Sequence, residues 1–132
     1  MLNITRINHS AINTRCELDE MNHFYAEVLG AKRVKRDIPE KFDKLIPGFW
    51  MEFSNGLVHV IEYDDEGEKP QVLPSKHSNP MGPHLAFYVE NIEAAAEHLD
   101  SHHILYDRFE SFIFTRDPAG NTVEFQQDPE CG

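Results

Sequence analysis

Near its end the chain reads Arg116-Asp117-Pro118-Ala119-Gly120-Asn121-Thr122-Val123-Glu124-Phe125, a predicted turn followed by a predicted strand. Asp-Pro-Ala-Gly places its residues where a type I turn prefers them. The residues that follow alternate between polar and apolar, which is typical of a half-buried strand. Glu124 therefore falls in mid-strand, on the side opposite its apolar neighbours. Because an unpaired buried charge is costly, this carboxylate needs a partner elsewhere in the chain or water.

Composition narrows the class of protein. The chain has 132 residues, a usual size for one domain, with 40% hydrophobic and 11% aromatic residues, as expected of a folded protein. The formal net charge of -11 argues against nucleic acid and anionic membrane surfaces as partners. We find no signal peptide and no apolar run long enough to span a membrane, so a soluble cytoplasmic protein is expected.

The first half predicts a strand, a helix and three further strands. Ile4–Thr14 is expected to form a strand with His9 at its centre. Apolar residues then recur at three- and four-residue steps from Leu18 to Leu29, which predicts a helix, and Gly30 stands where a C-terminal cap belongs. The further strands are expected at 31–38, 49–54 and 57–63, the last two joined as a hairpin at Asn55-Gly56.

The second half predicts the same order of elements. Residues 64–82 are acidic and then rich in Pro, Ser and Asn, as in a linker. They precede a strand over 83–89, a helix over 92–99 with Asn91 as its N-cap, and strands at 104–106, 111–115 and 122–126. The predicted fold class is therefore α+β, a single domain over 1–132 with module one at 1–63, the linker at 64–82 and module two at 83–128.

The two halves also match in residues. Asn8 to Ala11 (Asn-His-Ser-Ala) corresponds to Pro83 to Ala86 (Pro-His-Leu-Ala). Val58-His59-Val60 follows Asn55-Gly56 as Val123-Glu124-Phe125 follows Gly120-Asn121. The agreement indicates an internal duplication.

Four polar side chains take equivalent places in this duplication: His9, His84, His59 and Glu124. Strand alternation turns their apolar neighbours to the helices, and the four ligand-type groups to the opposite, concave face. Three imidazoles and one carboxylate favour Zn²⁺, Fe²⁺, Co²⁺, Ni²⁺ or Mn²⁺ over Ca²⁺ or Mg²⁺. The plainer interpretation, strand residues with ordinary hydrogen bonds, is weakest for His9, His84 and Glu124.

Several alternatives stay open around this predicted site. Glu62 competes with His59 for the fourth ligand position, but would turn His59 under the helix, so His59 is preferred. Alternatively, His59 is no ligand and acts as a general acid or base beside a His9–His84–Glu124 facial triad. The basic cluster from Lys32 to Arg36 could meet a carboxylate or phosphate or be solvated surface. Phe49 and Trp50 could line the cleft or belong to the core.

The chain resembles the vicinal oxygen chelate superfamily, which includes glyoxalase I, fosfomycin-resistance enzymes, bleomycin-resistance proteins and extradiol dioxygenases. Four stretches carry the resemblance and together span nearly the whole chain: Ile7–Ala11, Phe24–Gly30, Pro83–Val89 and Asp117–Phe125. It implies paired βαβββ modules that form a concave cleft with a divalent metal ion. By position, His9, His84 and Glu124 match the ligands of the family. His59 takes the fourth place, where bacterial glyoxalase-type members usually carry Glu.

The resemblance implies a metal-dependent lyase or isomerase of the glyoxalase type, acting on two adjacent oxygens of a small substrate. Three His and one Glu would leave the site with a formal charge of +1, which makes the ion a stronger Lewis acid. Glu124 and His59 are the candidate catalytic residues. One alternative is an iron-dependent extradiol-type dioxygenase, and another is a metal-free binding or resistance protein. Relatives commonly dimerise, so a homodimer is expected.

Overall fold

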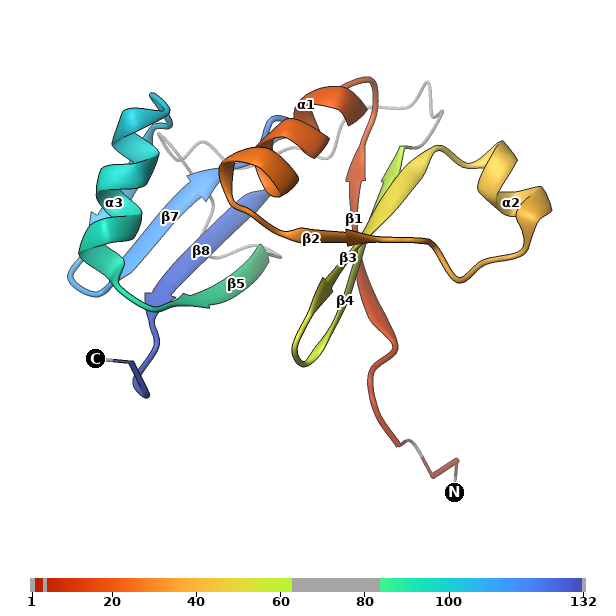
Figure 1. Cartoon of the computed structure of the whole chain (residues 1–132), viewed down its shortest axis with the longest axis horizontal. Coiled ribbons are helices and arrows are strands. Elements are labelled where there is room, and N and C mark those ends of the chain that lie inside the picture. The colour runs from red at the N-terminus through yellow and green to blue at the C-terminus, as the bar shows by residue number, and fades with distance from the viewer. Residues whose placement is uncertain (1, 4, 63–83, 132) are drawn as a thin grey trace. The chain divides into compact units, whose positions relative to one another are not determined.

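A computed structural model describes residues 2, 3, 5–62 and 84–131, and divides the chain into two compact units, Met1–Glu66 and Gly67–Gly132 (Figure 1). The predicted linker, 64–82, lies outside the described residues, and the predicted domain boundaries stay a prediction. No helix in the described part of the chain is long and apolar enough to cross a membrane.

Up to residue 62, the described part of the first unit is a four-stranded mixed sheet with three helical segments. Its elements are β1 (His9–Thr14), α1 (Leu18–Asn22), the π-helix η1 (His23–Val28), β2 (Lys32–Val34), α2 (Glu40–Leu45), β3 (Gly48–Phe53) and β4 (Gly56–Glu62). The strand order is β1-β4-β3-β2, with β1 parallel to β4 and the other pairs antiparallel. The helix ends where predicted, because Gly30 adopts a φ of 77° that suits glycine at a helix C-terminus.

The second unit repeats this topology, with one helix among its described residues, 84–131. Its elements are β5 (His84–Val89), α3 (Ile92–Ser101), β6 (Tyr106–Phe109), β7 (Phe112–Arg116) and β8 (Thr122–Gln127). The strand order is β5-β8-β7-β6, again with the first strand parallel to the last. The predicted α+β class and the paired βαβββ modules are therefore confirmed. The cleft predicted between the modules stays a prediction.

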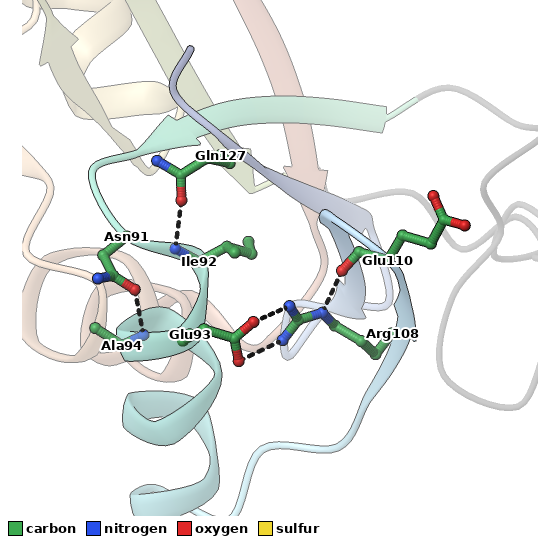
Figure 2. A network of polar contacts seen from close by, with 7 residues as sticks. All are labelled: Asn91, Ile92, Glu93, Ala94, Arg108, Glu110 and Gln127. Carbon is green, nitrogen blue, oxygen red and sulfur yellow. Dashed lines mark hydrogen bonds and ion pairs between the residues drawn. The ribbon is translucent and has the colours of Figure 1, made fainter. Parts of the chain in front are cut away.

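Polar contacts hold the start of α3 against the sheet of the second unit (Figure 2). The side chain of Asn91 accepts a hydrogen bond from the Ala94 amide at 2.9 Å, which confirms it as the N-cap. Gln127 of β8 accepts a hydrogen bond from the Ile92 amide at 2.9 Å. Arg108 of β6 forms an ion pair with Glu93 at 2.6 Å. Residues of β8 and β6 therefore both contact the first turn of the helix.

The turn Asp117–Gly120 joins β7 to β8 as the sequence predicts. The Gly120 amide donates to the Asp117 carbonyl at 2.9 Å, the i to i+3 bond of such a turn. Gly120 has a φ of 92°, which favours glycine. The Asp117 carboxylate accepts hydrogen bonds from the amides of Ala119 and Asn121 at 3.0 and 2.9 Å. This closed turn sets the register that places Glu124 on β8.

Four predicted elements differ from the structure, among them the strand predicted at 104–106, which forms at Tyr106–Phe109 as β6. The first strand begins at His9, and residues 5–8, which were predicted as strand, precede it, because its partner β4 begins only at Gly56 and His9 already pairs with Leu57. The second strand ends at Val34, and α2 follows it where a longer strand was predicted. The hairpin forms, but its two connecting residues are Ser54 and Asn55, so that Gly56 already belongs to β4.

Candidate functional site

The register of the parallel strands places the predicted site residues equivalently in the two units. In the first unit Ala11 pairs with His59, and His9 lies two residues before Ala11 on the same face. In the second unit Ala86 pairs with Glu124, and His84 again lies two residues before. Each unit therefore brings one pair together: His9 with His59, and His84 with Glu124.

The opposite face of the first sheet carries the apolar side chains. Val58, Val60 and Met51 on this face are at most 7% exposed. Glu62 shares the strand parity of Val58 and Val60, so it lies on the face opposite His59. Trp50 pairs with His59 across β3 and β4 and shares its face, whereas Phe49 lies on the apolar face.

Three rings form a cluster on the polar face of the first unit. The ring centroids of His9, Trp50 and His59 lie 5.4 to 5.8 Å from one another. Nδ1 of His9 lies 2.5 Å from the side-chain oxygen of Asn8. Because an amide oxygen can only accept, Nδ1 of His9 carries the proton and the lone pair of Nε2 is left for another partner.

Trp50 is buried within this cluster. Its indole N–H has no hydrogen-bond acceptor among the described residues. Leaving a buried donor unsatisfied costs about 1–3 kcal/mol. An oxygen-bearing ligand would offer an acceptor for it.

His59 is held by an arginine. Nη1 of Arg36 lies 3.3 Å from Nε2 of His59, and both residues are buried. A guanidinium only donates, so Nε2 of His59 accepts this hydrogen bond. Burial, the positive charge of Arg36 and the neighbouring His9 lower the pKa of His59 from 6.5 to about 4. His59 is therefore a neutral imidazole at pH 7.

The second unit holds a histidine and a carboxylate together. Nε2 of His84 lies 3.9 Å from Oε1 of Glu124. Gln126 donates a hydrogen bond to Oε2 of Glu124 at 2.6 Å, which leaves Oε1 on the side of His84. The Phe114 ring, 6.2 Å from that of His84, borders the pair. Glu124 is only 8% exposed, so its charge requires these partners, as its mid-strand position predicts.

The donor atoms of three of the four residues fit a divalent metal ion. His9 offers the lone pair of Nε2, and His84 and Glu124 direct a nitrogen and an oxygen toward each other. The lone pair of His59 is already used by Arg36. Within residues 2, 3, 5–62 and 84–131, no three His, Cys, Asp or Glu side chains are grouped closely enough to hold an ion. The two pairs belong to different units, and their union at one ion stays a prediction.

Arg36 is the site residue that sequence reasoning misses. In the sequence it stands out only as part of the basic cluster. Lys32 of that cluster does form an exposed ion pair with Glu52, but Arg36 is 8% exposed and bound to Asp43. The available signals are Pro39 before a run of helix-forming residues and Asp43 seven positions after Arg36.

The lowered pKa of His59 predicts a pH dependence of stability. Above pH 6.5 the ring is neutral in the folded and the unfolded chain, so its contribution to stability is complete. As the pH falls from 6.5 to about 4, the unfolded chain takes up a proton that folded His59 refuses, and stability declines. We expect wild type to lose more free energy of unfolding across this range than His59→Gln, measured by urea denaturation at each pH. Parallel pH profiles of the two proteins would contradict the assignment.

The sequence of the chain matches a known protein family. The model of the Glyoxalase/Bleomycin resistance protein/Dioxygenase superfamily matches residues 6–125. No curated protein is significantly similar in sequence.

Solved structures share the fold over nearly the full chain. A Bacillus anthracis protein assigned to the glyoxalase family is 25% identical, with 97% of this chain and 99% of that chain covered and a TM-score of 0.70. The trypanothione-dependent glyoxalase I of Leishmania major is 21% identical, with 94% and 87% covered and a TM-score of 0.70. The fosfomycin resistance protein FosX of Listeria monocytogenes is 14% identical, with 98% and 95% covered and a TM-score of 0.65. The last two likenesses concern the fold alone.

Proposed function

Because the chain belongs to the Glyoxalase/Bleomycin resistance protein/Dioxygenase superfamily, we propose that it is a metal-dependent enzyme of the glyoxalase type. Members of this superfamily usually use a divalent metal ion, bind small molecules and often form dimers. The proposed ligands are His9, His84 and Glu124, with His59 beside them as the fourth group of the predicted set. The observation that carries the proposal is the matched register, which gives each unit one pair of ligand-type side chains at equivalent places.

The ion, Glu124 and Trp50 would have different roles in the proposed reaction. A bound divalent ion would polarise two adjacent oxygens of a small substrate and stabilise the charge that develops on them. The Glu124 carboxylate, held by Gln126, would take a proton from the carbon next to a carbonyl and return it to the neighbouring carbon. The buried indole N–H of Trp50 would donate to a substrate oxygen. The proposed product is the isomer of the substrate.

The first test is the metal content and affinity of the purified chain, prepared without chelator or metal-affinity tag. We expect about one Zn²⁺, Ni²⁺ or Co²⁺ per chain, and a loss of affinity of more than about 100-fold in His9→Ala, His84→Ala and Glu124→Gln. Activity is then sought with hemithioacetals of glutathione. The matched control is the double variant His98→Ala/His102→Ala, which removes an exposed pair of histidines, His98 in α3 and its C-cap residue His102, with rings 4.7 Å apart. This control should bind metal as wild type does.

Two outcomes would contradict the proposal. If variants of each pair lose only half of the metal, each unit binds its own ion and the single centre is wrong. If no metal binds after reconstitution, the chain is better explained as a metal-free binding protein. Sedimentation of the same samples tests the proposed homodimer.

A second candidate is an iron-dependent dioxygenase of the extradiol type. The contact between Arg36 and His59 favours it, because it leaves two histidines and one carboxylate, the ligand set of non-haem Fe²⁺ oxygenases. Iron in the purified protein and O₂ consumption with a catechol would support this function. Turnover of a substrate without O₂ would exclude it.

A further inference from the structure

Arg36 is fixed on the first unit by several contacts. Its Nε donates to Oδ1 of Asp43 at 2.8 Å, and Nη2 donates to the Asp43 carbonyl at 2.9 Å. Nη2 also lies 2.8 Å from Oδ1 of the same residue. Asp43 therefore holds one edge of the planar guanidinium, and Nη1 is directed to Nε2 of His59.

The absence of a side chain at Gly48 leaves room for this guanidinium. Gly48 begins β3, on the face that carries Trp50 and His59. A Cβ at position 48 would lie 2.9 Å from Nη1 of Arg36 and 2.3 Å from the carbonyl oxygen of Val60. A side chain there would force Arg36 away from His59. The contact thus depends on three separate features of the sequence: Arg36, Asp43 and Gly48.

The contact decides what His59 can bind. A neutral imidazole has one lone pair, and that of His59 accepts a hydrogen bond from Arg36; its other nitrogen then carries the proton. A metal ion bound to His59 would have to displace a permanently charged guanidinium, whose buried donor would lose its acceptor. It would also lie close to that positive charge. Both effects oppose coordination.

We propose that Arg36, anchored by Asp43 and accommodated by the absent side chain of Gly48, withholds the lone pair of His59 from a metal ion, so that His9 and not His59 is the ligand that the first unit offers. His59 then acts as a positioning residue that remains neutral and fixed beside His9. The inference rests on the proposed function for the ion, but the state of His59 is testable without metal.

The metal test is a double-mutant cycle on Zn²⁺ affinity, measured by competition with a chromophoric chelator. We expect His59→Ala to change the affinity by less than about 3-fold, whereas His9→Ala lowers it more than about 100-fold. Arg36→Met removes the donor but keeps an apolar stem, so it should tighten binding about 10-fold or more. The gain should vanish in Arg36→Met/His59→Ala. A merely structural role of Arg36 would not produce tighter binding.

Co²⁺ absorption gives a second readout, because its visible bands report the ligand set. We expect the spectrum of Arg36→Met to differ from that of wild type, and that of His59→Ala to match wild type. Asp43→Ala loosens the same guanidinium and should tighten Zn²⁺ binding in the same direction, to a smaller extent. If Arg36→Met fails to fold, Asp43→Ala serves as the test variant in its place.

The inference is overturned if His59→Ala weakens Zn²⁺ binding as much as His9→Ala does. It is also overturned if folded Arg36→Met gains no affinity. Independently of metal, ¹⁵N NMR of the His59 ring should show an unprotonated Nε2 in wild type at pH 7. A protonated Nε2 would refute the inference even if the metal centre exists. An unprotonated Nε2 in a chain that binds no metal would instead uphold the contact and refute the proposed function.

Discussion

Gly48→Ala is expected to lower the free energy of unfolding of the first unit by about 3 kcal/mol, the upper range for overpacking. The added Cβ would lie 2.3 Å from the carbonyl oxygen of Val60, and a backbone atom of the adjacent strand cannot rotate away. It would also push against Nη1 of Arg36 at 2.9 Å. Fluorescence of Trp50, the single tryptophan, reports urea denaturation of this unit.

Gly56→Ala is the matched control for this prediction. Gly56 lies in the next strand, and a Cβ there would meet no atom within 4 Å. We expect this variant to be at least as stable as wild type, because alanine restricts the unfolded chain. Combining Gly48→Ala with Arg36→Met should recover little stability, since the clash with the Val60 carbonyl remains. A change below about 1 kcal/mol in Gly48→Ala would contradict the close packing at this position.

Asp117→Ala is expected to destabilise the second unit by about 3 kcal/mol, because it removes an acceptor of charge-assisted hydrogen bonds. Asp117 is only 4% exposed. Its carboxylate accepts hydrogen bonds from the amides of Ala119 and Asn121, and from the Asn121 side chain at 2.8 Å. Without it these donors lose their acceptor, and the turn that sets the register of Glu124 loosens. Thermal unfolding and hydrogen exchange of β7 and β8 measure both effects.

Two control variants separate the acceptor from the charge. Asp117→Asn keeps an oxygen that can accept from the two backbone amides, so its loss should be about 1 kcal/mol. Asp128→Ala removes a carboxylate near the C-terminus that accepts hydrogen bonds from the Glu130 amide and the Cys131 thiol. It should leave stability nearly unchanged. Equal losses in Asp117→Ala and Asp128→Ala would show that the turn is not held by the Asp117 carboxylate.

The sequence by itself determined the order of the strands, the duplication and the face on which His9, His59, His84 and Glu124 lie, but neither the helix α2 nor the role of Arg36. These features depend on short-range geometry, because successive side chains of a strand point to opposite faces whatever the rest of the fold does. The turn at Asp117 likewise follows from residues next to one another. Strand alternation, with the apolar neighbours turned to the helices, therefore assigns His9 and His59 to the polar face of one unit, and His84 and Glu124 to that of the other.

The tertiary structure alone decided how His59 is used. The helix α2, which carries Asp43, and the absent Cβ of Gly48 direct Arg36 to His59, which lies 23 positions further along the chain. The Arg36 side chain is long and has several rotamers, so its direction is not set by its own sequence position. Asp43 and the absent Cβ of residue 48 select one of these rotamers. The periodicity of a strand carries no information about such a contact. It predicted which face His59 occupies, but only packing between distant residues determined what its lone pair binds.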